Sequence, residues 1–176
     1  RAECGLPATG TVLCCFNNSY KYNPRSVARL LAVLRAVPDS VLWLLSGPGQ
    51  ADARLRAVAQ QAGVDPRRLV FMPKLPHEQY LARYALADLF LDTSPYNAHT
   101  TASDALWAGC PLLTTPGQTF ADRVAGSLNH QLVLFEHEQD HLVDVTLGHG
   151  DDVVKEFVEQ REREIARALH GNAFGR

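Results

Sequence analysis

The chain has 176 residues, of which 46% are hydrophobic and 20% charged, and its formal net charge is −2. This balance is typical of a soluble globular domain and gives no indication of a nucleic acid or a membrane surface as a partner. No apolar run reaches the ~20 residues of a transmembrane helix, and the first residues lack the apolar core of a signal peptide.

Cysteine usage and the chain ends add two expectations. The four cysteines form no C-x-x-C pair and no disulfide framework, which favours a reducing, cytoplasmic setting. The sequence opens at Arg1 without a methionine. We therefore expect residues 1–176 to be a single lobe of a larger protein.

Strand and helix signals alternate along the chain, as judged from apolar periodicity and from cap and turn residues. In chain order the sequence predicts a strand at 11–18, a helix at 26–37, a strand at 40–46, a helix at 51–63, a strand at 68–73, a helix at 77–87, a strand at 88–94, a helix at 99–109, a strand at 110–117 and a helix at 119–128. A last short strand is expected at 131–135, followed by closing helices at 141–148 and 151–171.

The predicted strands are short and apolar on both faces, as buried parallel strands are. Their alternation with helices predicts an α/β fold with a doubly wound, Rossmann-like parallel sheet and helices on both faces. Ligands of such sheets bind outside the carboxyl ends of the strands. The loops to search are therefore those that follow the strands: FNNSYKYNP, SGPGQ, PKLPHEQY, DTSPYNAHTT and TTPGQT.

The stretch PYNAHTTASDALWAGCP, residues 95–111, places an imidazole and two hydroxyls where a helix begins after the fourth strand. A helix N-terminus offers unpaired N–H groups and a partial positive charge, and His99, Thr100 and Thr101 add donors there. This pattern suits a phosphate or diphosphate. A structural alternative stays open, because Thr101 and Asp104 also fit a capping box that merely starts the helix.

The loop after the first strand carries a second group of polar residues. Asn18 and Lys21 follow the strand at the ligand edge, where a lysine can reach a phosphate as a point charge. A solvated surface lysine is the alternative.

Together these segments resemble a known family. FNNSYKYNP, VLWLL, PKLPHEQY, LADLFLDTSPYNAHTTASDALWAGCPLLT and PGQTFADRVAGSLN look like the C-terminal half of the catalytic region of O-GlcNAc transferases, and most of all like the bacterial members. The resemblance covers nearly the whole chain. It implies the C-terminal lobe of a GT-B glycosyltransferase, with tetratricopeptide helices and the other catalytic lobe upstream.

The resemblance also implies an activity and roles for individual residues. The intact enzyme would transfer GlcNAc from UDP-GlcNAc to serine or threonine hydroxyls of proteins, with inversion. Lys21 matches the catalytic lysine that binds the diphosphate and stabilises the leaving group, and Asn18 stands where animal enzymes have a glutamine. The matches to the other UDP-binding positions are His99, Thr100 and Thr101 for the phosphates, Asp104 for the ribose, Leu75 in the uracil-reading loop, His77 in place of a lysine that contacts the ribose, and Tyr80 in place of a histidine that stacks on uracil.

The chemistry of the implied reaction needs fixed donors at the leaving diphosphate and no metal, and the sequence has no D-x-D pair. No residue here is assigned as the general base, which we expect on the other lobe together with the protein acceptor.

Three alternatives stay open. The chain could be a nucleotide-binding module without turnover, or a relative of protein O-fucosyltransferases that uses GDP-fucose. His137 and His141 also fit the H-E-x-x-H signature of zinc hydrolases, with Glu159 as a possible third ligand.

Overall fold

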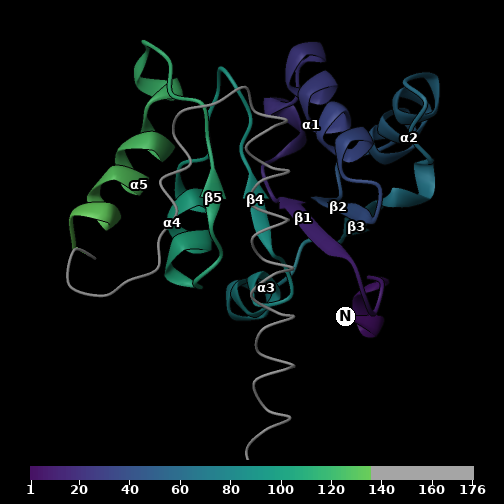
Figure 1. Ribbon diagram of the computed structural model, residues 1–176, viewed down its shortest axis with the longest axis horizontal. Helices are drawn as coiled ribbons and strands as arrows, with labels where there is room; N and C mark the ends of the chain where they lie inside the picture. The colour runs from purple at the N-terminus through teal and green to yellow at the C-terminus, as the bar shows by residue number, and fades with distance from the viewer. Residues whose placement is uncertain (136–176) are drawn as a thin grey trace, which may run out of the picture.

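The computed structural model describes residues 1–135, which form a five-stranded sheet with helices on both of its faces (Figure 1). All neighbouring strands are parallel, and their order across the sheet is β3-β2-β1-β4-β5. The strands are β1 (Thr11–Cys15), β2 (Ser40–Leu45), β3 (Leu69–Met72), β4 (Leu89–Leu91) and β5 (Leu112–Leu113). The sheet therefore confirms the predicted doubly wound α/β class.

Four α-helices connect the strands, a fifth follows β5, and four short 3₁₀ turns complete the described elements. The helices are α1 (Pro24–Ala36), α2 (Ala51–Gln61), α3 (His77–Tyr84), α4 (Thr100–Trp107) and α5 (Val124–Phe135). The 3₁₀ turns span Ala2–Cys4, Ser19–Lys21, Pro66–Arg68 and Phe120–Asp122.

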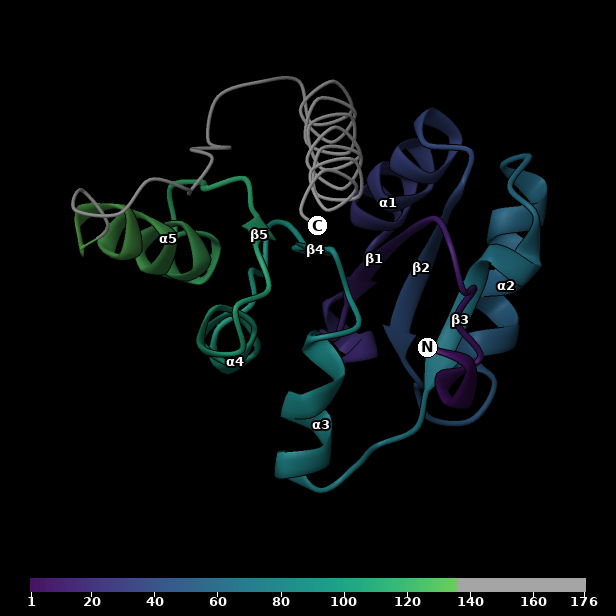
Figure 2. The same ribbon diagram turned by 60° about the horizontal axis from the view of Figure 1, so that its bottom comes forward.

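The core has two layers, one on each face of the sheet, because successive strand side chains point to opposite faces. Cys15 belongs to the layer that packs under α1 and α2, whereas its neighbour Cys14 belongs to the layer under α3, α4 and α5. Figure 2 shows the two groups of helices apart from each other across the sheet. Both cysteines are fully buried, as expected for a strand covered on both faces.

Local signals set the ends of the helices that matter for the site. Asn23 and Ser26 form a reciprocal capping box, with Pro24 in the first turn, so that α1 starts at Pro24, two residues before the predicted start at residue 26. After α4 the chain turns through Gly109 at a φ of 74°, a left-handed conformation that glycine adopts without strain.

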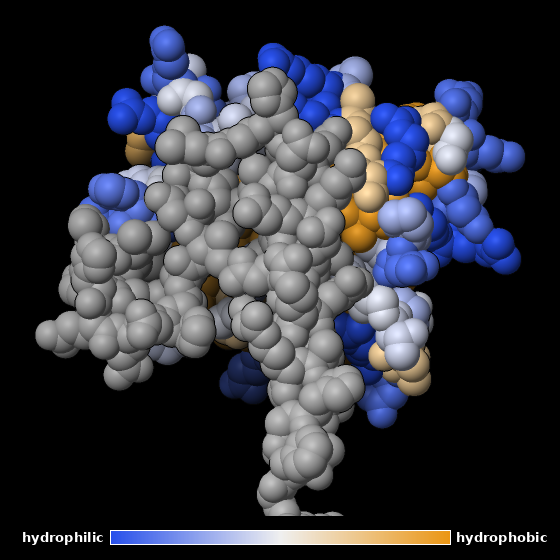
Figure 3. Space-filling view, in the orientation of Figure 1, coloured by the Kyte–Doolittle hydropathy of each residue, from blue (hydrophilic) through white to orange (hydrophobic). Residues whose placement is uncertain are grey.

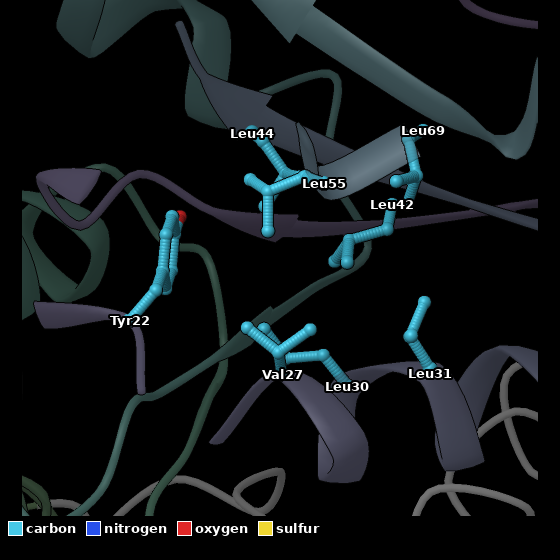
Figure 4. Close-up of a pocket in the computed structure, with 8 residues that line it drawn as sticks. All are labelled: Tyr22, Val27, Leu30, Leu31, Leu42, Leu44, Leu55 and Leu69. Carbon is cyan, nitrogen blue, oxygen red and sulfur yellow. The ribbon is translucent and has the colours of Figure 1, made fainter. Parts of the chain in front are cut away.

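A small apolar pocket lies between α1, α2 and the sheet (Figure 4). Its lining is Tyr22, Val27, Leu30, Leu31, Leu42, Leu44, Leu55 and Leu69. Figure 3 shows an apolar strip between the two helices, within a surface that is otherwise largely hydrophilic around them. The hydroxyl of Tyr22 donates to the carbonyl of Cys15, which leaves the pocket with no free polar group suited to a charged ligand.

One predicted element is wrong. Residues 131–135 were expected as a strand, but they form the last turns of α5. No proline or glycine occurs between Gly126 and Phe135, so the helix that buries Ala125 against the sheet continues through this apolar run. The zinc-hydrolase signature at 137–141, Glu159 and the helices expected at 141–148 and 151–171 lie outside the described residues. Over residues 1–135, no helix is both long and apolar enough to cross a membrane.

Candidate functional site

The strand order places the topological switch point of the sheet between β1 and β4, and in sheets of this class the ligand crevice lies outside the carboxyl ends of these two strands. Connections from β1 run to one side of the sheet and those from β4 to the other, so the loops after these two strands diverge at the carboxyl edge. The loop after β1 carries Asn17, Asn18 and Lys21, and the loop after β4 leads to His99. The two polar loops singled out in the sequence are therefore neighbours in the fold.

Lys21 is held inside this crevice. Its side chain is buried, with an exposed fraction of 8%, so the alternative of a solvated surface lysine is wrong. Its Nζ donates to the carbonyl of Asn97 at 2.7 Å and lies 4.4 Å from the ring centre of Tyr96. Burial lowers the pKa of Lys21, and the negative charge of Asp92 opposes that shift.

Helix α4 starts beside Lys21 without a side-chain cap. His99 is the N-cap residue, and its side chain accepts no hydrogen bond from the first turn. The capping box expected from Thr101 and Asp104 is therefore wrong, since Thr101 already lies inside the helix. The N–H groups of Ala102 and Ser103 donate to the carbonyl of His99, so within residues 1–135 those of Thr100 and Thr101 are the first-turn donors left for an anion.

This helix approaches the sheet closely because the residues on its inner side are small. Ala102 and Ala105 are fully buried, and Thr100 on the opposite side is exposed. The hydroxyl of Thr101 turns inward and donates to Oδ1 of Asn17 at 2.8 Å. Thr101 thus braces α4 against the β1 loop, while Nε2 of His99 lies 3.4 Å from the carbonyl oxygen of Ala121.

The structure brings Asn17, rather than Asn18, into the polar contacts of the crevice. Asn17 is fully buried and donates to Asp92 at 3.0 Å and to Thr93 at 2.9 Å. Asn18 is partly buried and starts the 3₁₀ turn, where its side chain makes no capping hydrogen bond. Sequence reasoning missed Asn17 and Asp92, although both are polar residues placed directly after apolar strands.

A second group of predicted residues gathers between α3 and α4. Nε2 of His77 lies 3.3 Å from Oδ1 of Asp104. The ring of Tyr80 stacks on that of His77 at 6.2 Å, and Leu75 is half-buried against the same core layer. The hydroxyl of Tyr84 donates to the carbonyl of Thr101 at 3.2 Å, which fixes α3 beside the start of α4.

The charges at this edge are unevenly distributed. Burial raises the pKa of the Tyr80 and Tyr84 hydroxyls, so both stay neutral at physiological pH. The positive charge of Lys21, in the loop after β1, lies beside the chain that leads into α4. The carboxylate of Asp104 lies on the other side, next to His77 of α3. Such an arrangement suits a ligand with an anionic group at one end and hydroxyl donors at the other.

Exposed aromatic rings border the Lys21 end. Tyr20 and Phe120 are 69% and 82% exposed, although large apolar side chains are usually covered. Ring centres lie 6.0 Å apart for Tyr20 and Tyr96, 5.3 Å for Tyr96 and His99, and 5.9 Å for His99 and Phe120. These four rings come from the loops after β1, β4 and β5 and form a row along the edge.

Comparison with known proteins places the fold among the Rossmann-like lobes of GT-B glycosyltransferases. Over 88% of the chain, the structure matches a mutant of the Thermobaculum terrenum O-GlcNAc transferase, with a TM-score of 0.72 and 28% identity, and covers 29% of that protein. A weaker match, with a TM-score of 0.54 and 20% identity, covers 98% of the chain and 48% of a sucrose-phosphate synthase from Thermosynechococcus elongatus. The second match supports the fold alone.

The chain belongs to glycosyl transferase family 41, whose model matches residues 1–168. It is 36% identical over 170 residues to an Arabidopsis thaliana protein named as a probable UDP-N-acetylglucosamine–peptide N-acetylglucosaminyltransferase. It is 41% identical over 127 residues to the UDP-N-acetylglucosamine–peptide N-acetylglucosaminyltransferase of Caenorhabditis elegans. These alignments cover 97% and 72% of this chain but only 16% and 11% of the two relatives.

Proposed function

We propose that the chain is the nucleotide-sugar-binding lobe of a protein O-glycosyltransferase that transfers GlcNAc from UDP-GlcNAc to serine or threonine hydroxyls. The protein acceptor and the general base would belong to the other lobe of the enzyme. Membership of family 41 supports the class of reaction, and the names of the relatives support the donor. Free cysteines at positions 4, 14, 15 and 110 support a cytoplasmic setting.

One observation carries the proposal for this lobe. A buried lysine and the uncapped N-terminus of α4 meet at the crevice between β1 and β4, with Lys21 bonded to Asn97 just two residues before His99. This combination concentrates positive potential at one point, which suits the diphosphate of a nucleotide sugar. Lysine Nζ has three N–H donors, so two remain for phosphate oxygens while one stays on Asn97.

The remaining residues fit the nucleoside. The side chain of Asp104 is 15% exposed, and within residues 1–135 its one polar partner is His77, at 3.3 Å. Its carboxylate can therefore accept from ribose hydroxyls. Leu75 and Tyr80 lie on the same side and offer an apolar surface and a ring on which uracil can stack. The diphosphate would thus lie over α4, and the base would lie toward α3.

We propose that catalysis by this lobe is metal-independent. Negative charge develops on the leaving diphosphate, and Lys21 with the α4 N–H groups is arranged to stabilise it without a metal. Each such donor contributes about 3 kcal/mol to lowering a barrier in well-studied enzymes.

A calorimetric titration tests the proposal. The chain is titrated in EDTA with UDP, UDP-GlcNAc and GDP. We expect saturable binding of UDP and UDP-GlcNAc and much weaker binding of GDP. Selective binding of GDP would favour the fucosyltransferase relative, and a folded chain that binds none of these nucleotides would contradict the assignment of the nucleotide site to this lobe.

A further inference from the structure

Asp92 stands at the centre of a hydrogen-bond network behind the crevice. It follows β4 directly, and its carboxylate accepts four hydrogen bonds. Oδ1 accepts from the backbone N–H groups of Thr93 (2.7 Å) and Ala98 (2.6 Å) and from Nδ2 of Asn17 (3.0 Å). Oδ2 accepts from the hydroxyl of Thr114 (2.7 Å). One carboxylate therefore joins the ends of β1, β4 and β5.

The network continues to residues that face the crevice. Oδ1 of Asn17 accepts from Thr101, so Asp92 is only one side chain away from the first turn of α4. The loop between β4 and α4 is closed on itself as well, because Nδ2 of Asn97 donates to the carbonyl of Thr93 at 2.7 Å. Asn97 then accepts from Lys21 through its own carbonyl. Every member of this chain of contacts is buried or partly buried.

The four donors to Asp92 are neutral groups. The ion pairs within residues 1–135 join Arg1 to Asp88 and Arg67 to Asp65, and His77 lies 3.3 Å from Asp104. None of these contacts includes Asp92 or Lys21. Within residues 1–135 no carboxylate therefore contacts the Lys21 ammonium directly, and any negative charge that stabilises it acts through space.

The groups around Lys21 show which of them supplies a negative charge. One peptide group joins the two charges, because the carbonyl of Asn97 accepts from Lys21 and the N–H of Ala98 donates to Asp92. Across this short link the negative charge of Asp92 raises the pKa of Lys21, which burial lowers. Cys15, also close to Lys21, stays a neutral thiol because burial raises its pKa to about 12. Tyr96 presents the face of its ring to Nζ, and His99 lies next to Tyr96.

We propose that Asp92 is a positioning residue of the diphosphate site: its carboxylate fixes the loop that carries Asn97 and His99, and its negative charge keeps the buried Lys21 ammonium protonated. The proposal rests on the proposed function, since it takes the diphosphate as the ligand of Lys21. Asp92 itself does not touch the ligand. It acts through Asn17, Ala98 and the charge on Lys21.

Replacement of the carboxylate by an amide separates the two parts of this role. Asp92→Asn keeps the size of the side chain and an oxygen that accepts at Oδ1. The hydroxyl of Thr114 can rotate to accept from the new amide, so the shape of the network is retained. The charge is lost. Asn17→Ala has the opposite effect, because it keeps the charge of Asp92 and removes the link to α4.

The experiment is a calorimetric titration with UDP-GlcNAc, whose two phosphates have no second ionisation near neutral pH, from about pH 6 to about pH 10. Binding needs the protonated lysine, so affinity falls as the pH rises through the pKa of Lys21. In Asp92→Asn we expect this fall at a pH lower by about one unit, which is a tenfold loss of affinity at the alkaline end relative to the parent. In Asn17→Ala we expect affinity about tenfold lower at every pH, with an unchanged midpoint.

The outcomes separate the inference from the function on which it rests. If the parent chain does not bind UDP-GlcNAc, the proposed function fails. If the parent binds and folded Asp92→Asn has the same midpoint, the charge role of Asp92 is wrong. If Asn17→Ala binds like the parent, the positioning role is wrong, and this variant keeps the test decisive even where Asp92→Asn does not fold. Arg54→Ala, on the exposed face of α2, is the control and should behave like the parent.

Discussion

Replacement of Lys21 by methionine tests the role of the buried ammonium. Methionine keeps most of the aliphatic stem that fills the crevice and removes the charge. A hydrogen bond to a charged group contributes about 1.5–3 kcal/mol, and Lys21 is only 8% exposed, so little water can replace the lost contact. Since Nζ has three N–H donors, it can bind phosphate without breaking its hydrogen bond to the carbonyl of Asn97, so no existing hydrogen bond is lost on binding. We therefore expect a loss of about 2 kcal/mol, or roughly 30-fold weaker binding of UDP.

The same variant should remain folded. Burial lowers the pKa of Lys21 in the folded state below its unfolded value, so the unfolded chain binds more protons between the two values. The parent therefore gains stability as the pH rises through that window, and Lys21→Met should lose this dependence. The assays are titration calorimetry with UDP and thermal unfolding at several alkaline pH values, with Arg54→Ala as the matched control. A folded Lys21→Met chain that binds UDP as tightly as the parent would refute the role of the lysine.

Further predictions concern the nucleoside end, the metal and the fold. Asp104→Ala should weaken binding of UDP by about 1–3 kcal/mol but leave binding of inorganic pyrophosphate unchanged, and equal losses for both ligands would show that Asp104 acts on the phosphates. Addition of EDTA in place of Mg²⁺ should leave the affinity for UDP unchanged, and a loss in EDTA would indicate a metal. Leu34→Ala should cost about 2–5 kcal/mol of unfolding free energy in chemical denaturation because Leu34 is fully buried, and a cost below 1 kcal/mol would contradict the packing. Gly10→Ala should destabilise by more than about 1 kcal/mol, since φ is 88° and a Cβ there would meet the carbonyl of Asp39, and an unchanged melting temperature would contradict this backbone conformation.

Much of the fold follows from local signals in the sequence. The strands are apolar on both faces, and Asn23, Pro24 and Ser26 set the start of α1, so period and cap residues suffice for these elements. The strand predicted at 131–135 failed because a short apolar run has no period that separates a strand from a buried helix. In the structure these residues are helical, because the helix that begins at Val124 continues without a break to Phe135.

The candidate site could be predicted less completely. The sequence places Lys21, His99 and Asp104 at the ligand edge. In the structure Lys21 bonds to the loop that leads to His99, and Asp104 lies on the side of α3. The sequence alone does not show that the Thr101 side chain points inward to Asn17, or that His99 rather than Thr101 is the N-cap of α4; the structure shows both. These features depend on the approach of β1 to β4, which is a long-range contact that no local pattern encodes. Asp92 was missed for the same reason, because its four donors come from three separate strand ends.

The position of the nucleotide is the central claim, and chemical-shift mapping tests it most directly. Backbone amide resonances of the isotopically labelled chain are followed during titration with UDP in EDTA. We predict the largest shifts at Lys21, at Leu75 and over residues 99–104, with little change in α1 and α2. Saturable binding whose shifts avoid these residues and gather around the apolar pocket between α1 and α2 would contradict the account.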